Sequence, residues 1–348
     1  MRSNSKMSIW KRKSLWISAV VLLVLGSATL YVIWRELNGQ DIIGALKHAN
    51  PFWVVIAALF GIIYFLADAM NIGRCLKLMG YNKNYGQLLK YSFAGFFFSS
   101  VTPSSTGGQP GQLYFMNKDG IKVSSGAFSL LCALLSFQII SVLWGVIGAV
   151  FAPHGFWEMT GKYAYVFPIG FALNIGIIVM LFCVLFSRRM TRLFSCIALK
   201  IPGKKPVKPG DKFKTLRSLA SYRKAAKLMS RHKIVFFKML LNSFVQITVF
   251  FSIPFLCAKA LGATDLTWWQ GICTQGALFL SVSSLPLPGA AGVTEYGYAL
   301  FFKDLIPETI LGSTLLLSRF WNFIIPLIES ALGMLVLQLK SKTRRTIE

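Results

Sequence analysis

A run of helix-breaking and hydroxyl residues interrupts an apolar segment in the first half of the chain. The run extends from Ser99 to Gln112 and contains two prolines and three glycines. Proline removes a backbone donor and glycine weakens a helix, so a continuous helix through this run is disfavoured. At membrane depth, irregular backbone survives only where protein buries it or a water-filled cavity solvates it. This interruption therefore constrains the fold strongly.

A second interruption, from Ser283 to Glu295, lies in the other half of the chain. A pair of Pro- and Gly-interrupted apolar segments, one in each half, is typical of transport proteins, whose substrate site lies at the breaks. The residues that we predict to break helices are Pro103, Gly107, Gly108, Pro110, Pro286, Pro288, Gly289 and Gly292.

The composition supports a membrane setting for both interruptions. Of the 348 residues, 55% are hydrophobic, and the mean hydropathy is +0.58. Several apolar windows of about 20 residues match the thickness of a bilayer core. The first window, 15–33, follows basic residues and has no small-residue cleavage site after it, which indicates a retained anchor rather than a signal peptide. The sequence predicts an all-α polytopic membrane protein.

Lysine and arginine indicate how the chain crosses the membrane. The segment 187–233 contains fifteen Lys and Arg residues and one acid, so it belongs in the cytoplasm together with both basic termini. This assignment requires the interrupted segments 91–118 and 268–302 to enter and leave the membrane on the same side. We therefore predict two re-entrant hairpins that enter from opposite faces.

The predicted architecture is a single membrane domain with six full spans and two re-entrant hairpins in an inverted-topology repeat. Repeats of this kind are the usual plan of alternating-access carriers. The predicted spans are 15–33, 52–72, 124–151, 163–186, 234–258 and 309–339; the repeats are 52–151, with hairpin 91–118, and 234–339, with hairpin 268–302; the basic loop is 187–233.

We expect few ionisable groups inside the bilayer, namely Asp68, Lys238, Glu295, Arg319 and Glu329. Such residues are costly in a bilayer and normally face a partner or a cavity. Glu295 follows the second break, where the start of a half-helix favours a carboxylate. Arg319 in the next span is its candidate partner. The pair either contacts a lipid headgroup or locks the hairpin to the span.

The first break offers neutral hydrogen-bonding groups instead. Either these groups meet a headgroup, with a phosphate at a helix N-terminus, or they satisfy their own broken backbone. The candidate residues are Thr102, Ser104, Ser105, Thr106, Gln109 and Gln112.

Other kinds of chemistry have little support in the sequence. The six cysteines and three histidines show no metal-ligand spacing, and there is no nucleotide-binding or hydrolase motif. We therefore expect no metal, no cofactor and no catalytic residue. The basic loop lacks aromatic interleaving, so we expect an anionic membrane surface as its partner and no nucleic acid. An interfacial helix over 212–233 would suit that surface.

Both interruptions also carry a family resemblance. Thr102–Pro110 with Gln112-Leu113-Tyr114, and Leu287–Glu295, resemble the lysylphosphatidylglycerol synthase transmembrane family, the flippase-like membrane half of multiple peptide resistance factor proteins. The family's first motif commonly reads Gly-Glu-x-x-Arg, where this chain has the neutral Gln109 and Gln112. The acid Glu295 and the arginine Arg319 are retained.

The resemblance implies a lipid flippase in the bacterial plasma membrane that moves a phospholipid, expected to be anionic, or an aminoacylated phospholipid between leaflets. It links the chain to lipid metabolism and cationic peptide resistance. Full-length relatives carry a soluble synthase domain; nine residues follow Leu339 here, so we expect no lysyltransferase activity from this chain alone. Two alternatives stay open: a membrane subunit that needs a separate soluble synthase, and a small-solute carrier. Aromatic external helices could also form a homodimer interface.

Overall fold

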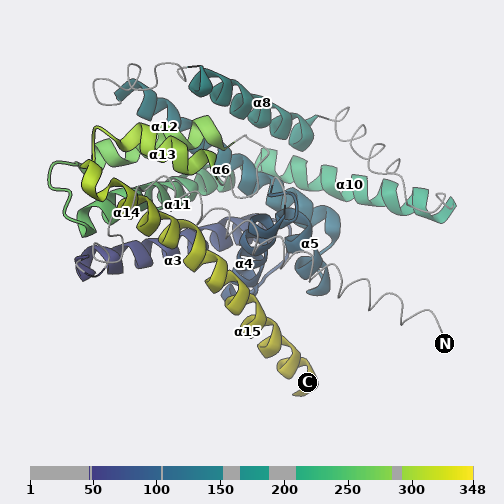
Figure 1. Cartoon of the computed structure of the whole chain (residues 1–348). Coiled ribbons are helices and arrows are strands. Elements are labelled where there is room, and N and C mark those ends of the chain that lie inside the picture. The colour runs from purple at the N-terminus through teal and green to yellow at the C-terminus, as the bar shows by residue number, and fades with distance from the viewer. Residues whose placement is uncertain are drawn as a thin grey trace.

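The computed structural model describes residues 47, 49–102, 105–151, 165–187, 209–283 and 292–347, and every regular element within them is a helix (Figure 1). Five helical segments are long and apolar enough to cross a membrane: α3 (Pro51–Leu78), α6 (Val123–Phe151), α8 (Val166–Phe186), α11 (Lys233–Ala260) and Glu308–Met334. These segments match the last five predicted spans. The first predicted span, 15–33, lies outside the described residues.

The last of these segments is not one uniform helix. It consists of α14 (Glu308–Arg319), a π-helical turn η4 (Phe320–Ile324) and α15 (Ile325–Ile347). A π-helical turn is rare and occurs mostly inside longer helices at functional sites. The sequence analysis predicted an unbroken span over 309–339, so the π-helical turn is a feature that it missed.

Two helical hairpins lie between the long helices. The first joins α4 (Tyr85–Val101) to α5 (Gly108–Lys118), and the second joins α12 (Trp268–Val282) to α13 (Val293–Phe302). With 11 residues, α5 is about 16 Å long, roughly half the thickness of a bilayer core. The two helices of each hairpin pack against each other, and in each hairpin the second helix is the shorter one.

The boundaries of the first hairpin differ from those predicted. α4 begins at Tyr85 rather than at residue 91, because Asn84 and Gln87 form a reciprocal capping box. Gly108 and Pro110 are not helix breaks; they form the first turn of α5. A proline is tolerated there, because the first N–H groups of a helix have no intrahelical acceptor.

The long helices and hairpins pack in a reciprocal pattern. α3 lies along α11, α6 packs against α12 of the second hairpin, and α15 packs against α4 of the first hairpin. At the α6–α12 contact a Cβ on Gly276 would lie 2.7 Å from the carbonyl oxygen of Trp144, so only glycine allows this approach. Buried polar groups link α3, α11 and α6, since Asn71 donates to Ser243 at 2.8 Å and Ser243 to Ser136 at 3.0 Å.

The helix predicted over 212–233 is present as α10 (Pro209–Arg231). It packs against α6 and α8 through Tyr222, whose ring lies 5.3 Å from that of Phe128 and whose hydroxyl donates to the carbonyl of Val184 at 3.2 Å. α10 and α15 both extend beyond the helical bundle (Figure 1).

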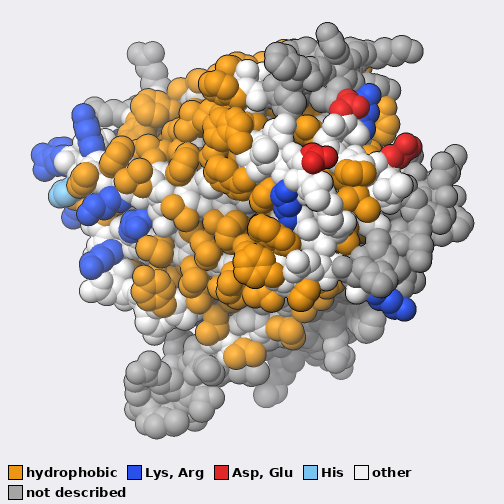
Figure 2. Space-filling model, turned by 90° about the vertical axis from the view of Figure 1, so that its left-hand side faces the viewer, with side chains coloured by type: hydrophobic (Ala, Val, Ile, Leu, Met, Phe, Trp, Pro, Cys, Tyr) orange, Lys and Arg blue, Asp and Glu red, His pale blue; other side chains and the backbone are white. Residues whose placement is uncertain are grey.

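The surface separates apolar from charged side chains. Figure 2 shows hydrophobic side chains over the broad middle of one face, most of the Lys and Arg at its left edge and Asp and Glu confined to its right part. Large apolar side chains on the long helices are highly exposed, among them Phe52 (63%), Phe182 (57%) and Leu332 (58%). A broad exposed apolar band of this kind suits contact with lipid.

Candidate functional site

Residues that flank both helix breaks line one cavity of about 730 Å³. Ser99, Ser105 and Gln109 line it from the first hairpin, and Ser283 and Thr294 line it from the second. The residues of the first hairpin are nearly 200 positions from those of the second in sequence, and the packing of five long helical segments around them brings them together. α3, α6, α8, α11 and the last span complete the wall.

The first break satisfies part of its own backbone. The Thr102 hydroxyl donates to the carbonyl of Phe98 at 2.6 Å and accepts from the N–H of Gly107 at 2.8 Å. Ser105 adopts a left-handed conformation with φ of 53°. The bonds of Thr102 therefore support the alternative in which the polar groups of the first break satisfy their own broken backbone. Pro103 and Ser104 lie outside the described residues.

Other polar groups of the first hairpin face the cavity. Ser105, Gln109 and Gln112 line it, and the buried side chain of Gln112 packs against Gly95 of α4. Thr102 and Thr106 do not contribute to its lining. Of the predicted candidates in the first break, Thr102 holds the break, and Ser105, Gln109 and Gln112 face the cavity.

The second break is supported by α8. Asn174 donates to the carbonyl of Leu280 at 3.2 Å and lies within 3.3 Å of the Ser283 hydroxyl, so it satisfies the end of α12. Sequence reasoning missed Asn174, although a lone asparagine in a long apolar helix is itself a signal of polar contact between helices. Pro286, Pro288 and Gly289 lie outside the described residues.

Glu295 and Arg319 form the predicted ion pair. Arg319 Nη2 lies 2.6 Å from Glu295 Oε1, and the side chain of Glu295 is only 4% exposed. The other oxygen, Oε2, accepts from the N–H of Gly292 at 2.5 Å, and Gly292 has a φ of +84° that favours glycine. Glu295 therefore caps α13 and holds one edge of the guanidinium of Arg319, while Arg319 itself lines the cavity.

A second charged group lines the cavity on α3. The Asp68 carboxylate accepts from the Ser92 hydroxyl at 2.6 Å and from the side chain of Gln246. Among the described residues that line the cavity, Asp68 and Arg319 alone carry charge. Asp68 forms no ion pair within the described part of the chain. The cavity therefore has a guanidinium, that of Arg319 on α14, and a carboxyl group, that of Asp68 on α3.

Aromatic side chains cover another part of the wall. Tyr64 and Phe250 have ring centroids 4.9 Å apart, and Phe65 and Phe96 have centroids 5.4 Å apart. Aromatic rings give a rigid apolar surface. A ligand in this cavity would meet polar groups at the helix breaks and an apolar surface beside them, which is the chemistry of an amphiphile. No cluster of metal-binding side chains occurs in the part of the chain that the structure describes.

Comparison with known proteins gives the family. The model of the lysylphosphatidylglycerol synthase TM region matches residues 15–329. The chain belongs to this family. A UPF0104 membrane protein from Archaeoglobus fulgidus is 24% identical over 304 residues, which are 83% of this chain and 88% of the relative. A UPF0104 membrane protein from Methanocaldococcus jannaschii is 24% identical over 101 residues, 29% of this chain and 30% of that protein.

The family match confirms the resemblance that the two interruptions carry. Together with the five apolar helices of spanning length, it identifies a multi-pass membrane protein. At the first break, this family member places the neutral amides of Gln109 and Gln112 against the cavity. Its charged cavity residues come from α3 and from the last span instead.

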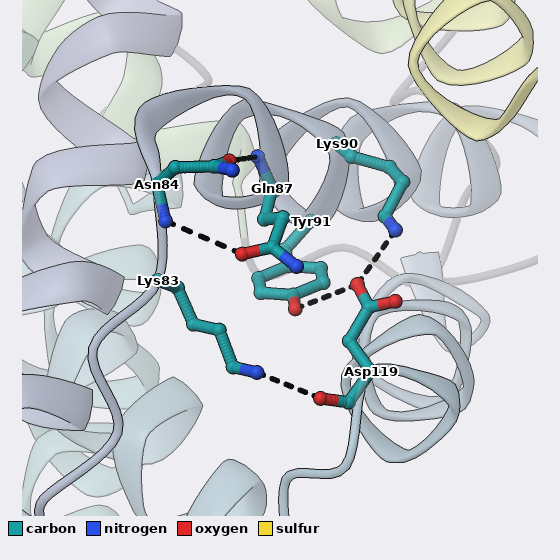
Figure 3. A network of polar contacts seen from close by, with 6 residues as sticks. All are labelled: Lys83, Asn84, Gln87, Lys90, Tyr91 and Asp119. Atoms are coloured by element: carbon teal, nitrogen blue, oxygen red, sulfur yellow. Dashed lines mark hydrogen bonds and ion pairs between the residues drawn. The ribbon is translucent and has the colours of Figure 1, made fainter. Parts of the chain in front are cut away.

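A buried ion pair fastens the open end of the first hairpin (Figure 3). Lys90 Nζ lies 2.6 Å from Asp119 Oδ2, and these side chains are 3% and 5% exposed. The Tyr91 hydroxyl donates to the same oxygen at 2.8 Å, and Lys83 donates to the carbonyl of Asp119 at 2.7 Å. Sequence reasoning placed Lys83 and Lys90 in a basic loop and did not select Asp119. No local pattern pairs residues 29 positions apart.

Proposed function

We propose that this protein moves a phospholipid between the two leaflets of a membrane, with the lipid headgroup passing through the cavity between the two helix breaks. The observation that carries the proposal is the shared cavity: residues of both interrupted hairpins line one space. Substrate sites of inverted-repeat transporters lie at breaks of this kind, near the middle of the bilayer.

The reciprocal packing supports an inverted repeat. Suppose that α3 corresponds to α11, the first hairpin to the second hairpin, and α6 to the last span. Exchanging the two halves of the chain then turns the α6–α12 contact into the α15–α4 contact. It also leaves the α3–α11 contact in place. This is the pattern that a two-fold relation between the halves would produce. An axis in the membrane plane would make the two hairpins re-entrant from opposite faces.

The distribution of charge supports the same topology. Lys77, Lys83 and Lys122 flank the first hairpin and the start of α6, where α10 adds further basic residues. Asp265, Asp304 and Glu308 lie at the connections of the second hairpin. A basic end faces the cytoplasm by preference, so both termini would be cytoplasmic and the second hairpin would enter from outside.

The cavity chemistry fits a phospholipid. Its volume of about 730 Å³ lies in the range of small-molecule sites and can hold a headgroup with its phosphate. The guanidinium of Arg319 suits a phosphate oxygen, and the Asp68 carboxylate can accept from an amine or hydroxyl of the headgroup. The aromatic rings suit the glycerol and upper acyl carbons. We therefore favour a phosphodiester lipid over a small soluble solute.

The test is a leaflet-accessibility assay with the purified full chain in unilamellar vesicles. Vesicles contain a trace of phosphatidylglycerol or phosphatidylethanolamine with a fluorescent headgroup, and a membrane-impermeant reagent destroys the fluorophore from outside. The proposal predicts that inner-leaflet lipid becomes accessible faster than in protein-free vesicles. Equal rates in both kinds of vesicle, with each headgroup, would contradict it.

A further inference from the structure

The π-helical turn η4 has a clear cause in the sequence. Pro326 has no N–H, so the carbonyl of Asn322 four residues earlier receives no ordinary helical hydrogen bond. The N–H of Ile325 instead donates to the carbonyl of Phe320, five residues back, as in a π-helix. The widened turn begins directly after Arg319.

This turn directs several side chains into the cavity. Arg319, Asn322 and Phe323 all line it. Arg319 directly precedes the π-helical turn, and Asn322 and Phe323 lie within it. Glu295, on α13, pairs with Nη2 of the guanidinium.

Several buried polar atoms of residues that line the cavity have no hydrogen-bond partner among the described residues. They include Nε of Arg319 and Oδ1 of Asn322, and Oε1 of the nearly buried Gln275 on α12. A buried polar atom that nothing satisfies destabilises the fold. Other polar groups of the cavity lining are paired, since Ser92 bonds Asp68 and Ser100 bonds the carbonyl of Phe96. The unsatisfied groups thus point to the wall at which a polar ligand binds.

We propose that Asn322 contacts the ligand and that, together with the free Nε edge of Arg319, it binds the phosphodiester of the lipid headgroup. A primary amide donates through Nδ2 and accepts through Oδ1, and rotation of its terminal group by 180° exchanges the two atoms. Glu295 pairs with Nη2 of Arg319, and the unpartnered Nε–H and the Asn322 amide would give a phosphate two donors. This inference rests on the proposed function and adds a specificity-determining residue.

The test measures binding rather than movement. Isothermal titration calorimetry on the detergent-solubilised full chain compares three probes: dihexanoyl-phosphatidylglycerol, glycerol 3-phosphate and dihexanoylglycerol. The near-isosteric Asn322→Leu should bind the phospholipid about tenfold more weakly, because one hydrogen bond is lost and its partner is left unsatisfied. Asn322→Gln, which keeps an amide, should lose less affinity for the phospholipid than Asn322→Leu. The exposed Asn117→Leu on α5 is the matched control and should bind as the wild type does.

The probes separate the source of the phosphate. If Asn322→Leu binds both phosphate-bearing probes more weakly and dihexanoylglycerol as the wild type does, a phosphate subsite at Asn322 is supported. If Asn322→Leu loses affinity for the phospholipid alone, the occupant of that subsite is a lipid headgroup. Equal phospholipid affinity for the wild type and Asn322→Leu would overturn the inference, as would a wild type that binds no phosphate-bearing probe. A protein that shows the expected binding but leaves lipid in its leaflet contradicts only the proposed function.

Discussion

Arg319→Gln slows lipid movement in reconstituted vesicles by about 10–100-fold, if the headgroup phosphate meets the guanidinium as proposed. A hydrogen bond to a charged group contributes about 1.5–3 kcal/mol, and each 1.4 kcal/mol is a factor of ten. The cavity residues within the described ranges include no other cation to replace it. The rate of headgroup exposure in the leaflet-accessibility assay measures the loss.

A double variant separates this role from a structural one. Arg319→Gln alone leaves the Glu295 carboxylate, 4% exposed, without its cation, which also destabilises the fold. Adding Glu295→Gln removes that charge, and the new amide can still accept from the N–H of Gly292. We expect the double variant to regain stability and to remain slow. Recovery of the wild-type rate would make the pair a purely structural lock between α13 and the last span.

Asp119→Ala lowers the free energy of unfolding by about 3–5 kcal/mol. The variant leaves the ammonium of Lys90, 3% exposed, buried without its carboxylate, and the cost of an unpaired buried charge is of this size. It also removes the acceptor of the Tyr91 hydroxyl at the open end of the first hairpin. An SDS titration of the purified protein, followed by circular dichroism, should show the loss as an earlier unfolding midpoint.

The double variant Lys90→Met with Asp119→Leu serves as the comparison for this pair. Replacing both charges by apolar side chains of similar volume is often neutral or stabilising. We therefore expect the double variant to unfold close to the wild-type midpoint. If the Asp119→Ala protein is as stable as the wild type, water must solvate the Lys90 ammonium, which contradicts the burial of this side chain in the structure.

The long helices could be predicted closely because runs of apolar residues set their limits. The span predicted over 124–151 is α6, Val123–Phe151, almost unchanged. The hairpin start was placed six residues late, because Lys90 was taken as a loop residue although its partner Asp119 buries it. The capping box at Asn84 and Gln87 was a readable signal of the true start.

The site could be predicted only in part. The ion pair of Glu295 with Arg319 followed from the cost of charges in a membrane, and the structure confirms it. Residues beside both breaks meet Asp68 in one cavity because of how five long helical segments pack, and no local sequence pattern reports that packing. Pro326 was a local signal of the π-helical turn, but the prediction treated 309–339 as one span and did not use it. Whether the cavity carries lipid stays a prediction.

The most direct test of the central claim blocks the cavity itself. Gln109→Trp on α5 places an indole against the cavity, whereas Tyr114→Trp on the same helix changes a ring that is 61% exposed and outside the cavity lining. The rate at which inner-leaflet headgroups become accessible is compared for the two variants and the wild type at equal protein density. We predict that Gln109→Trp falls to near the rate of protein-free vesicles, while Tyr114→Trp matches the wild type. A folded Gln109→Trp protein that moves lipid at the wild-type rate would contradict a headgroup path between the two hairpins.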